Sequence, residues 1–343
     1  MLSGTVDDAI GDKTKPSIPP EWITYEDELE LIWGMNWGAQ SEIGRLEEVI
    51  VSRPGPELSP PNEEMKWHAI RHPIDWKKAA EQHDALIKVL KDEGITVHYD
   101  ERPASALMKG PYGVQLSRNP GLRDPGVVVN GGAIIGRMAM AFRRGEEVFW
   151  AKKISQLGCP ILYTVRGTGI FEGGNVVWLD PFHVCIGIGA RTNIEGVNQI
   201  TPILRASKVE EIRSVSIPYA LDNYDWPAGG WPHLDCVFGY VAPNLAVIYP
   251  AAVGYDFVQY LRLKKVRMIE ALPDEARDAA CNTLALEPGK IIMNTAGPHL
   301  RRQLEREKID VITVEMSEFA LHGGGPHCQV GCLIRQAGPS LES

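Results

Sequence analysis

The stretch NVVWLDPFHVCIGIG, residues Asn175–Gly189, contains two runs of apolar and β-branched residues on either side of the turn sequence DPFH. β-Branched residues favour strands, and proline and aspartate favour tight turns, so this stretch predicts a β-hairpin. The same arrangement recurs in GVVVNGGAIIGRM, residues Gly126–Met138, and in CVFGYVAPNLAVIYP, residues Cys236–Pro250. Three hairpins with short turns indicate a repeated structural module.

A helix-like stretch follows each of these hairpins, at residues 146–158, 195–208 and 255–272. A further amphipathic helix is predicted for Asp75–Gly94, which begins with a capping aspartate, repeats apolar residues at helical spacing and ends in glycine. Strands are predicted before and after this helix, in LEEVIVSRPG and ITVHYD. The β-rich runs EVIVSR and HCQVGCLIR near the two ends of the chain could complete further units.

The predicted fold class is α/β. Repeated hairpin-plus-helix modules indicate several small sheets around a common axis, in the manner of a propeller. A doubly wound parallel sheet would alternate single strands with helices and would usually carry a glycine-rich phosphate turn. The sequence contains neither the GxGxxG fingerprint nor a P-loop. An α+β domain with hairpins is the alternative.

Length and charge exclude several classes of protein. The chain has 343 residues and a formal net charge of −9, which argues against a nucleic acid or an anionic membrane as partner. The N-terminus lacks the basic start and hydrophobic region of a secretory signal. We predict a flexible N-terminal extension at residues 1–22 and a single catalytic domain at residues 23–343. Six scattered cysteines are typical of reduced thiols, so we expect a cytoplasmic enzyme.

The segment LHGGGPHCQVGC, residues Leu321–Cys332, places thiols and imidazoles behind three glycines. One interpretation is a loop that presents Cys328 as a nucleophile, at the beginning of a strand and exposed to a cleft. The metal alternative takes its ligands from two histidines and two cysteines, His322, His327, Cys328 and Cys332. Its C-x3-C spacing is unusual for zinc and the sequence has no second cluster, so we predict no metal and no cofactor. A Cys328–Cys332 disulfide is sterically awkward along one extended strand.

Three further segments carry polar residues beside glycine, proline or an apolar run. In WPHLDCVF, a strand would place His233 and Asp235 on one face, where they offer a proton carrier and a carboxylate. In FEGGN, Glu172 precedes two glycines and could fix the tautomer of an imidazole, with Asn175 behind it. In RDPG, Asp124 precedes a proline that forces an extended backbone. Each segment taken alone is also compatible with an ordinary turn or a surface residue.

Six segments in order resemble the motifs of the guanidino-group-modifying enzyme superfamily, which has the pentein fold: SEIGRLEEVIVSRPG, RDPG, FEGGN, ARTN, HLDCVF and GGGPHC. This superfamily includes arginine deiminases, dimethylarginine dimethylaminohydrolases and amidinotransferases. The matches extend from about Ser41 to Cys332, nearly the whole chain. The resemblance implies a five-fold pseudosymmetric α/β propeller, which agrees with the hairpin-plus-helix repeats.

The resemblance also implies roles for the matching residues. Cys328 would attack the central carbon of a guanidinium group and form a covalent thiouronium intermediate. His233 would protonate the leaving amine and then activate water, and Glu172 would hold the imidazole. Asp124 and Asp235 would bind guanidinium N–H groups, since carboxylates suit a planar cation with several donors. The expected partner is therefore a small cationic guanidino or amidino substrate, and a homo-oligomer is compatible with the sequence.

Arg191 in ARTN matches a position that often binds a substrate carboxylate in this superfamily, and Arg143 lies near a second such position. Two departures from the motifs concern the substrate. Asn175, a predicted substrate-binding residue, replaces an acid found in deiminases, and His322 and Gly323 stand where arginine deiminases carry an arginine. These departures argue against free arginine and favour a modified or longer guanidine or amidine.

The favoured function is hydrolysis of a C–N bond in a guanidino or amidino compound, with release of ammonia or an amine. One alternative is an amidinotransferase that delivers the amidino group to an acceptor amine, and a second is a dihydrolase-like release of two ammonias. A third is a binding protein, because the same architecture also serves a translation factor. Residues Asp222–Trp231 are expected to form either a substrate lid or a packing loop.

Overall fold

The computed structural model describes most of the chain, namely residues 24, 27–29, 32, 36–60, 62–65, 68, 70, 72–100, 121–218, 230–321 and 323–341. The predicted N-terminal extension, most of the predicted lid and His322 lie outside these residues. The assignment of residues 23–343 to one domain stays a prediction. No helix among the described residues is long and apolar enough to cross a membrane.

The described strands form five three-stranded sheets, each with the same internal order. In four of them a hairpin of two antiparallel strands is followed by a helix and then by a third strand, which pairs in parallel with the second. A parallel pair requires such a crossover, because the chain must return to the same end of the sheet. The predicted hairpins are thereby confirmed as parts of larger modules.

Two modules come from the middle of the chain. One contains β3 (Gly126–Val129), β4 (Gly132–Ile135), α4 (Glu146–Gln156) and β5 (Ile161–Thr164). The next contains β6 (Val176–Asp180), β7 (His183–Ile188), α5 (Ile194–Ala206) and β8 (Glu211–Ser216).

Two further modules follow in the second half. One contains β9 (Phe238–Ala242), β10 (Leu245–Ile248), α6 (Tyr255–Leu263) and β11 (Arg267–Glu270). The other contains β12 (Leu284–Glu287), β13 (Lys290–Asn294), α8 (Pro298–Arg306) and β14 (Asp310–Val314), and the short helices α7 (Pro273–Arg277) and α9 (Ser317–Ala320) flank it.

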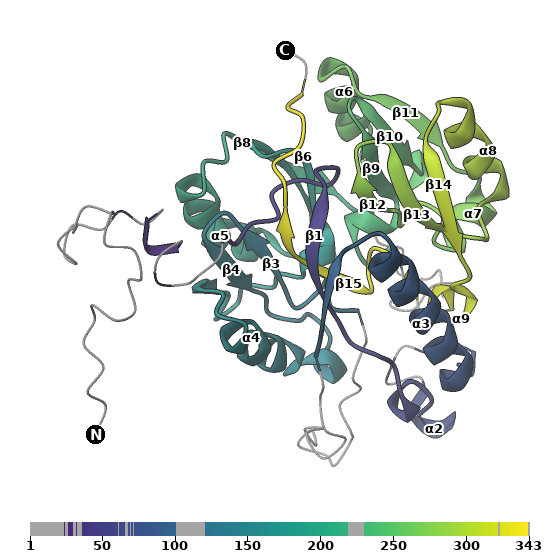
Figure 1. Ribbon diagram of the computed structural model, residues 1–343, viewed down its shortest axis with the longest axis horizontal. Coiled ribbons are helices and arrows are strands. Elements are labelled where there is room, and N and C mark those ends of the chain that lie inside the picture. The colour runs from purple at the N-terminus through teal and green to yellow at the C-terminus, as the bar shows by residue number, and fades with distance from the viewer. Residues whose placement is uncertain are drawn as a thin grey trace.

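The two ends of the chain build the remaining module. The last strand, β15 (Val330–Arg335), pairs antiparallel with β1 (Leu46–Val51), which pairs in parallel with β2 (Thr96–Tyr99). The helices α2 (Asn62–Met65) and α3 (Trp76–Asp92) lie between β1 and β2 in the chain. Figure 1 shows the purple strand β1 and the yellow strand β15 side by side. The prediction that the chain ends complete a unit is confirmed.

Two sequence predictions of elements need correction. The stretch 255–272 is predicted to be helical throughout, whereas α6 ends at Leu263 and β11 follows. Basic residues, methionine and glutamate favour helices locally, but β10 offers a free edge and β11 pairs with it. The hairpin of β12 and β13 was not predicted, although Gly289 has the positive φ of 82° that its turn requires.

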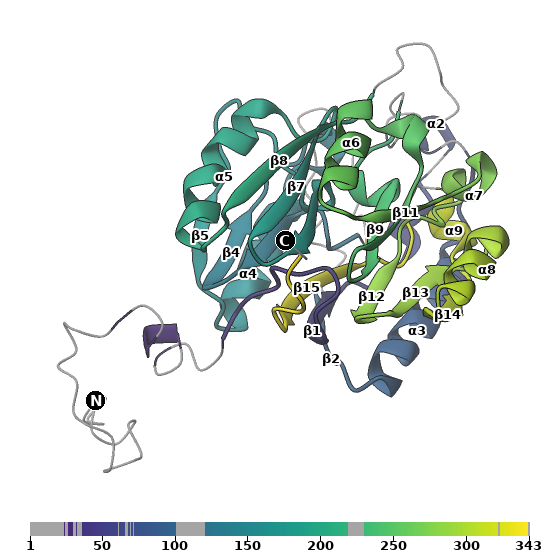
Figure 2. The same cartoon turned by 90° about the horizontal axis from the view of Figure 1, so that it is seen from above.

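The sheets contact one another in the order of the chain. Strand β15 contacts β3, β6 contacts β9, β9 contacts β12, and β12 contacts β1. The side chains of β3 and β4 share a hydrophobic cluster with those of β6 and β7, which supplies the remaining link. Figure 2 shows α3, α5 and α8 toward the outside of the molecule. Loops at one end of each sheet are thereby brought together at the centre.

Candidate active site

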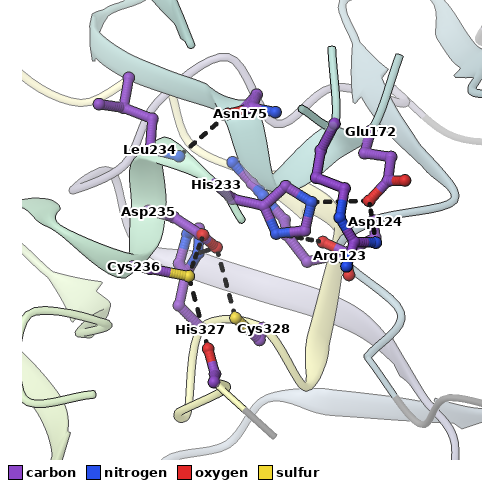
Figure 3. A network of polar contacts seen from close by, with 12 residues as sticks. Arg123, Asp124, Glu172, Asn175, His233, Leu234, Asp235, Cys236, His327 and Cys328 are labelled. Carbon is purple, nitrogen blue, oxygen red and sulfur yellow. Dashed lines mark hydrogen bonds and ion pairs between the residues drawn. The ribbon is translucent and has the colours of Figure 1, made fainter. Parts of the chain in front are cut away.

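The polar centre is built from loops that precede the first strand of each hairpin. Asp124 lies two residues before β3, Cys236 two before β9, Asn282 two before β12 and Cys328 two before β15. The glycine pair of FEGGN occupies the corresponding place before β6. Because the modules repeat, equivalent loop positions from distant parts of the chain meet, and Figure 3 shows several of these side chains in one network.

His233 lies between two carboxylates. Its Nε2 is 2.7 Å from Oε2 of Glu172, and its Nδ1 is 3.5 Å from Oδ1 of Asp124 (Figure 3). Burial by itself would lower the pKa of His233, but the two carboxylates outweigh it and raise that pKa above its ordinary value. The two carboxylates therefore favour the protonated form of the ring, which has a proton to give.

Glu172 stays ionised although it is fully buried. Burial would raise its pKa, but Arg191, His233 and Arg143 lower it to about 2. Its Oε1 also accepts a hydrogen bond of 2.7 Å from the backbone N–H of Ala139. The carboxylate is thus fixed as an anion that orients the imidazole of His233.

The two arginines singled out in the sequence differ in their surroundings. Arg143 donates to Oδ2 of Asp124 at 2.7 Å and to Oε2 of Glu146 at 2.8 Å, so its guanidinium is paired with carboxylates of the chain itself. Nη1 of Arg191 lies 3.6 Å from Glu172, and its Nε and Nη1 donate no hydrogen bond to any described residue. Arg191 is the better placed of the two to receive an anionic group, because buried N–H groups without acceptors are costly.

Cys328 lies in a turn held by Asn282. The amide of Asn282 donates to Sγ of Cys328 at 3.1 Å, and its Oδ1 accepts from the backbone N–H of Cys328 at 3.0 Å. Sγ is also 3.7 Å from Oδ2 of Asp235. The prediction of a thiol exposed at the beginning of a strand is wrong in two respects: Cys328 is 6% exposed, and β15 begins at Val330.

The pKa of the Cys328 thiol lies above its ordinary value. The neighbouring thiol of Cys236 lowers it by hydrogen bonding, but burial and the charges of Asp235 and Asp124 outweigh that effect. The sulfur of Cys328 is therefore protonated at neutral pH. A cation bound beside these two carboxylates would offset their charge and favour the thiolate.

The segment HLDC does not have the predicted strand conformation. Leu234–Cys236 forms a 3-10 turn and β9 begins only at Phe238. The backbone N–H of Leu234 donates to Oδ1 of Asn175 at 3.0 Å, a contact that no periodicity in the sequence could indicate. His233 and Asp235 are nevertheless both buried in the site, because the turn directs both inward.

Asn175 is engaged at both ends of its amide. Besides the bond from Leu234, its Nδ2 donates to Oγ1 of Thr192 at 2.9 Å. The predicted substrate-binding role of Asn175 stays a prediction, and in this structure the side chain ties the FEGGN and HLDC loops to ARTN.

Several buried residues of the network were not assigned to the site from the sequence. They are Glu42, Arg123, Glu146, Cys236 and Asn282, and His327 was considered only as a metal ligand. Asn282 holds the same place before β12 that Cys328 holds before β15, but this place was not recognised because the hairpin of β12 and β13 was not predicted. Glu42 lies in SEIGRLEEVIVSRPG and Arg123 lies in RDPG, but only the hydrogen bond between their side chains shows that both belong to the network.

Among the residues that the structure describes, two groups of three side chains are close enough to share a metal ion. They are His233, Asp235 and Cys236, and Asp124, Glu172 and His233, with ligand atoms within 4.8 Å of one another. The second group is already paired with the guanidinium of Arg143, whose positive charge opposes a metal there. The metal ligands weighed from the sequence are not among these groups, and His322 lies outside the described residues.

The fold and the site together define a class of protein: an α/β chain of hairpin-plus-helix modules whose central loops gather a thiol, an imidazole and carboxylates. A family model described as arginine deiminase matches residues 122–267 and 254–335. The chain belongs to the arginine deiminase family, within the guanidino-group-modifying superfamily that the motifs resembled. Membership indicates an enzyme that modifies guanidino or amidino groups by hydrolysis or group transfer.

Two of the relatives that match most of the chain are the following. A Bacillus subtilis protein, "Uncharacterized protein YkgA", is 27% identical over 297 residues, which are 86% of this chain and 94% of that protein. A "2-nitroimidazole nitrohydrolase" of Mycobacterium sp. is 27% identical over 282 residues, which are 79% of this chain and 72% of that protein.

Two solved structures share the fold. The dimethylarginine dimethylaminohydrolase (DDAH) of Pseudomonas aeruginosa, as a mutant complexed with citrulline, has a TM-score of 0.66 at 22% identity, covering 84% of this chain and 99% of that chain. The amidinotransferase SxtG of Microseira wollei has a TM-score of 0.70 at 17% identity, covering 90% of this chain and 99% of that chain.

Proposed function

We propose that this protein is a cysteine-dependent hydrolase that breaks a C–N bond in a guanidino or amidino compound. The observation that carries the proposal is the grouping of the Cys328 sulfur, the Asp235 carboxylate beside it and the His233 imidazole held by Glu172. These are the nucleophile, the cation-binding group and the acid–base group that such a substitution requires. Membership of the arginine deiminase family supports the same chemistry.

The proposed reaction has two stages. The Cys328 thiolate forms a bond to the amidino carbon, and the C–N bond breaks while the His233 imidazolium gives its proton to the leaving amine. The product is a thiouronium attached to the enzyme. Neutral His233 then takes a proton from water, whose oxygen attacks the same carbon, and the C–S bond breaks. One water is consumed and one amine is released.

The proposed substrate is a small cation held by Asp124 and Asp235, with Arg191 receiving an anionic group elsewhere on it. Oδ2 of Asp124 already accepts from Arg143, whereas its Oδ1 accepts no hydrogen bond from a described residue and could receive a guanidinium N–H. We assign Arg143 and Asn175 supporting contacts at the edge of the substrate site. A cytoplasmic location and a homo-oligomer also stay predictions.

We also propose that the five modules surround a pseudo-five-fold axis as a propeller. Support comes from the contacts of each sheet with two others in chain order. The similarity to DDAH and SxtG supports the same architecture.

Group transfer is the second candidate function. The similarity to SxtG concerns the fold, and the family includes both reactions, so the acceptor distinguishes them. Adding glycine or ornithine to the reaction would divert the amidino group from water if the chain were a transferase. Release of two ammonias per substrate would indicate the dihydrolase-like alternative.

The test is mass spectrometry of the intact protein after acid quench with a panel of arginine, methylated arginines, agmatine, guanidino acids and cyclic amidines. We expect an adduct on the peptide that contains Cys328, with amine or ammonia released in parallel. Cys328→Ser should abolish both, whereas Cys332→Ser should keep most of the turnover, because Cys332 packs in the separate cluster with Val49 and Val330. Equal loss in both variants would contradict the single-nucleophile mechanism.

A further inference from the structure

A buried ionic network lies behind Asp235, on the side away from His233. Nδ1 of His327 is 2.8 Å from Oδ2 of Asp235, and its Nε2 is 3.0 Å from Oε2 of Glu42. The other oxygen of Glu42 accepts from Nη2 of Arg123 at 3.1 Å and from the backbone N–H of Trp178 at 3.2 Å. Both ring nitrogens of His327 are thus used between two carboxylates.

The charged groups that face His327 are Glu42, Asp235 and Arg123. Burial and Arg123 would lower the pKa of His327, but the two carboxylates raise it to about 9. The pKa of Glu42 falls to about 2, because Arg123 and His327 outweigh its burial. At neutral pH the ring is an imidazolium that donates one N–H to each carboxylate, so it cannot rotate without losing both bonds.

This arrangement fixes Asp235 against the nucleophile. The oxygen that His327 holds is the one 3.7 Å from the Cys328 sulfur, and the other oxygen lies 3.5 Å from the sulfur of Cys236. His327 and Cys328 are successive residues in one turn, so the backbone that positions the sulfur also positions the ring that holds the carboxylate. Figure 3 shows this grouping below His233.

We propose that His327, supported by Glu42, is a positioning residue that sets where Asp235 holds the amidino group relative to the Cys328 sulfur. This inference rests on the proposed function, because it assumes that Asp235 binds the substrate cation. Both ring nitrogens of His327 contact carboxylates, so His327 would act on the substrate only through Asp235. Its removal should therefore affect recognition of the amidino cation more than the intrinsic reactivity of the thiol.

The test compares two alkylating reagents of the same shape, the cationic 2-chloroacetamidine and the neutral 2-chloroacetamide. Each forms an S–C bond to Cys328 and releases chloride, but only the amidinium can pair with Asp235. The selectivity of the protein is the ratio of the two rates, divided by the same ratio for a small free thiol. His327→Leu and Glu42→Gln should each lower this selectivity about tenfold or more, with the chloroacetamide rate changed less than about twofold.

Three controls make the result specific. His327→Asn keeps a donor near Nδ1 and should recover part of the selectivity that His327→Leu loses. His183→Asn breaks a similar histidine–carboxylate contact, 2.8 Å to Asp180, far from the site, and should leave the selectivity unchanged. Thermal unfolding of every variant checks that it is folded. If His327→Leu does not fold, Glu42→Gln is the variant that tests the proposal.

The outcomes separate the two proposals. A wild-type protein that prefers the amidine, with variants that keep the preference, would overturn the role of His327 and leave the proposed function standing. A wild-type protein with no preference for the amidine would overturn binding of the cation by Asp235, and the role of His327 with it. Loss of the preference in His327→Leu and Glu42→Gln, with partial recovery in His327→Asn, supports the positioning role.

Discussion

At the scale of residues, each buried carboxylate of the site contacts cationic or polar side chains that hold it in place. Glu172 is paired with His233, and Asp235 is shared between His327 and two thiols. Together with burial, the charge of Asp235 raises the pKa of the Cys328 thiol above its ordinary value. The thiol of Cys236 acts in the opposite direction, because it donates to the Cys328 sulfur.

Cys236→Ala should shift the titration of Cys328 to higher pH. The substitution removes the hydrogen bond that lowers the pKa of Cys328, while burial and the carboxylates that raise it remain. The measurement is the rate of alkylation by iodoacetamide as a function of pH, with Cys185→Ala as a control, since Cys185 is a buried thiol in β7 outside the network. An unshifted profile in Cys236→Ala would show that the two thiols do not interact.

At the scale of elements, short helices and turns place the loops of the site. The helix α5 begins directly after ARTN, and the Asn193 side chain caps it by accepting from the backbone N–H of Gly196. Oδ1 of Asn193 also accepts from Ile170, just before Glu172. Gly196 lies so close to the carbonyl oxygen of Ile170 that a Cβ there would overlap it. The start of α5 is therefore packed against the FEGGN loop.

Gly196→Ala should destabilise the protein, although alanine usually favours a helix over glycine. The added methyl group would push α5 away from the backbone of Ile170, and we expect the free energy of unfolding to fall by about 1–3 kcal/mol. Asn198→Ala, at an exposed position of the same helix, should be neutral or slightly stabilising. Urea denaturation of both variants gives the comparison, and a stabilised Gly196→Ala would refute the close approach.

At the scale of the whole molecule, the network of Glu42, Arg123, Asp235 and His327 joins loops from three modules. Glu42 precedes β1, Arg123 precedes β3, Asp235 precedes β9 and His327 precedes β15. Buried ion pairs of this kind hold distant segments in one geometry, and removal of one partner leaves a charge without compensation. The charge state of His327 therefore affects the stability of the entire fold.

The stability of the protein should decrease as the pH rises from about 6.5 to about 9. The pKa of His327 is about 9 in the folded protein and near the ordinary 6.5 in the unfolded chain, so its contribution is complete below pH 6.5 and is lost as the pH rises through 9. The loss is at most about 3 kcal/mol. Denaturation at both pH values should show that the free energy of unfolding decreases less for His327→Asn than for the wild type. Equal decreases in the two proteins would contradict a charged His327.

The sequence by itself determined three of the hairpins, the helices that follow them and the order of the motifs. Alternating β-rich runs with turn residues identified three hairpins, and the spacing of polar residues beside glycines singled out Cys328, His233 and Glu172. These signals are local, because strand pairing in a hairpin and the amphipathicity of a helix involve residues close in the chain.

Only the tertiary structure decided which side chains meet and in what state. The strand β11 forms because β10 offers a parallel edge, although its local sequence favours a helix. The pairing of Arg143 with Asp124, the amide of Asn282 on Cys328 and the contact of Glu42 with His327 each join residues that other modules position. Burial then sets their charges, since a buried group takes the protonation state that its nearest partners stabilise.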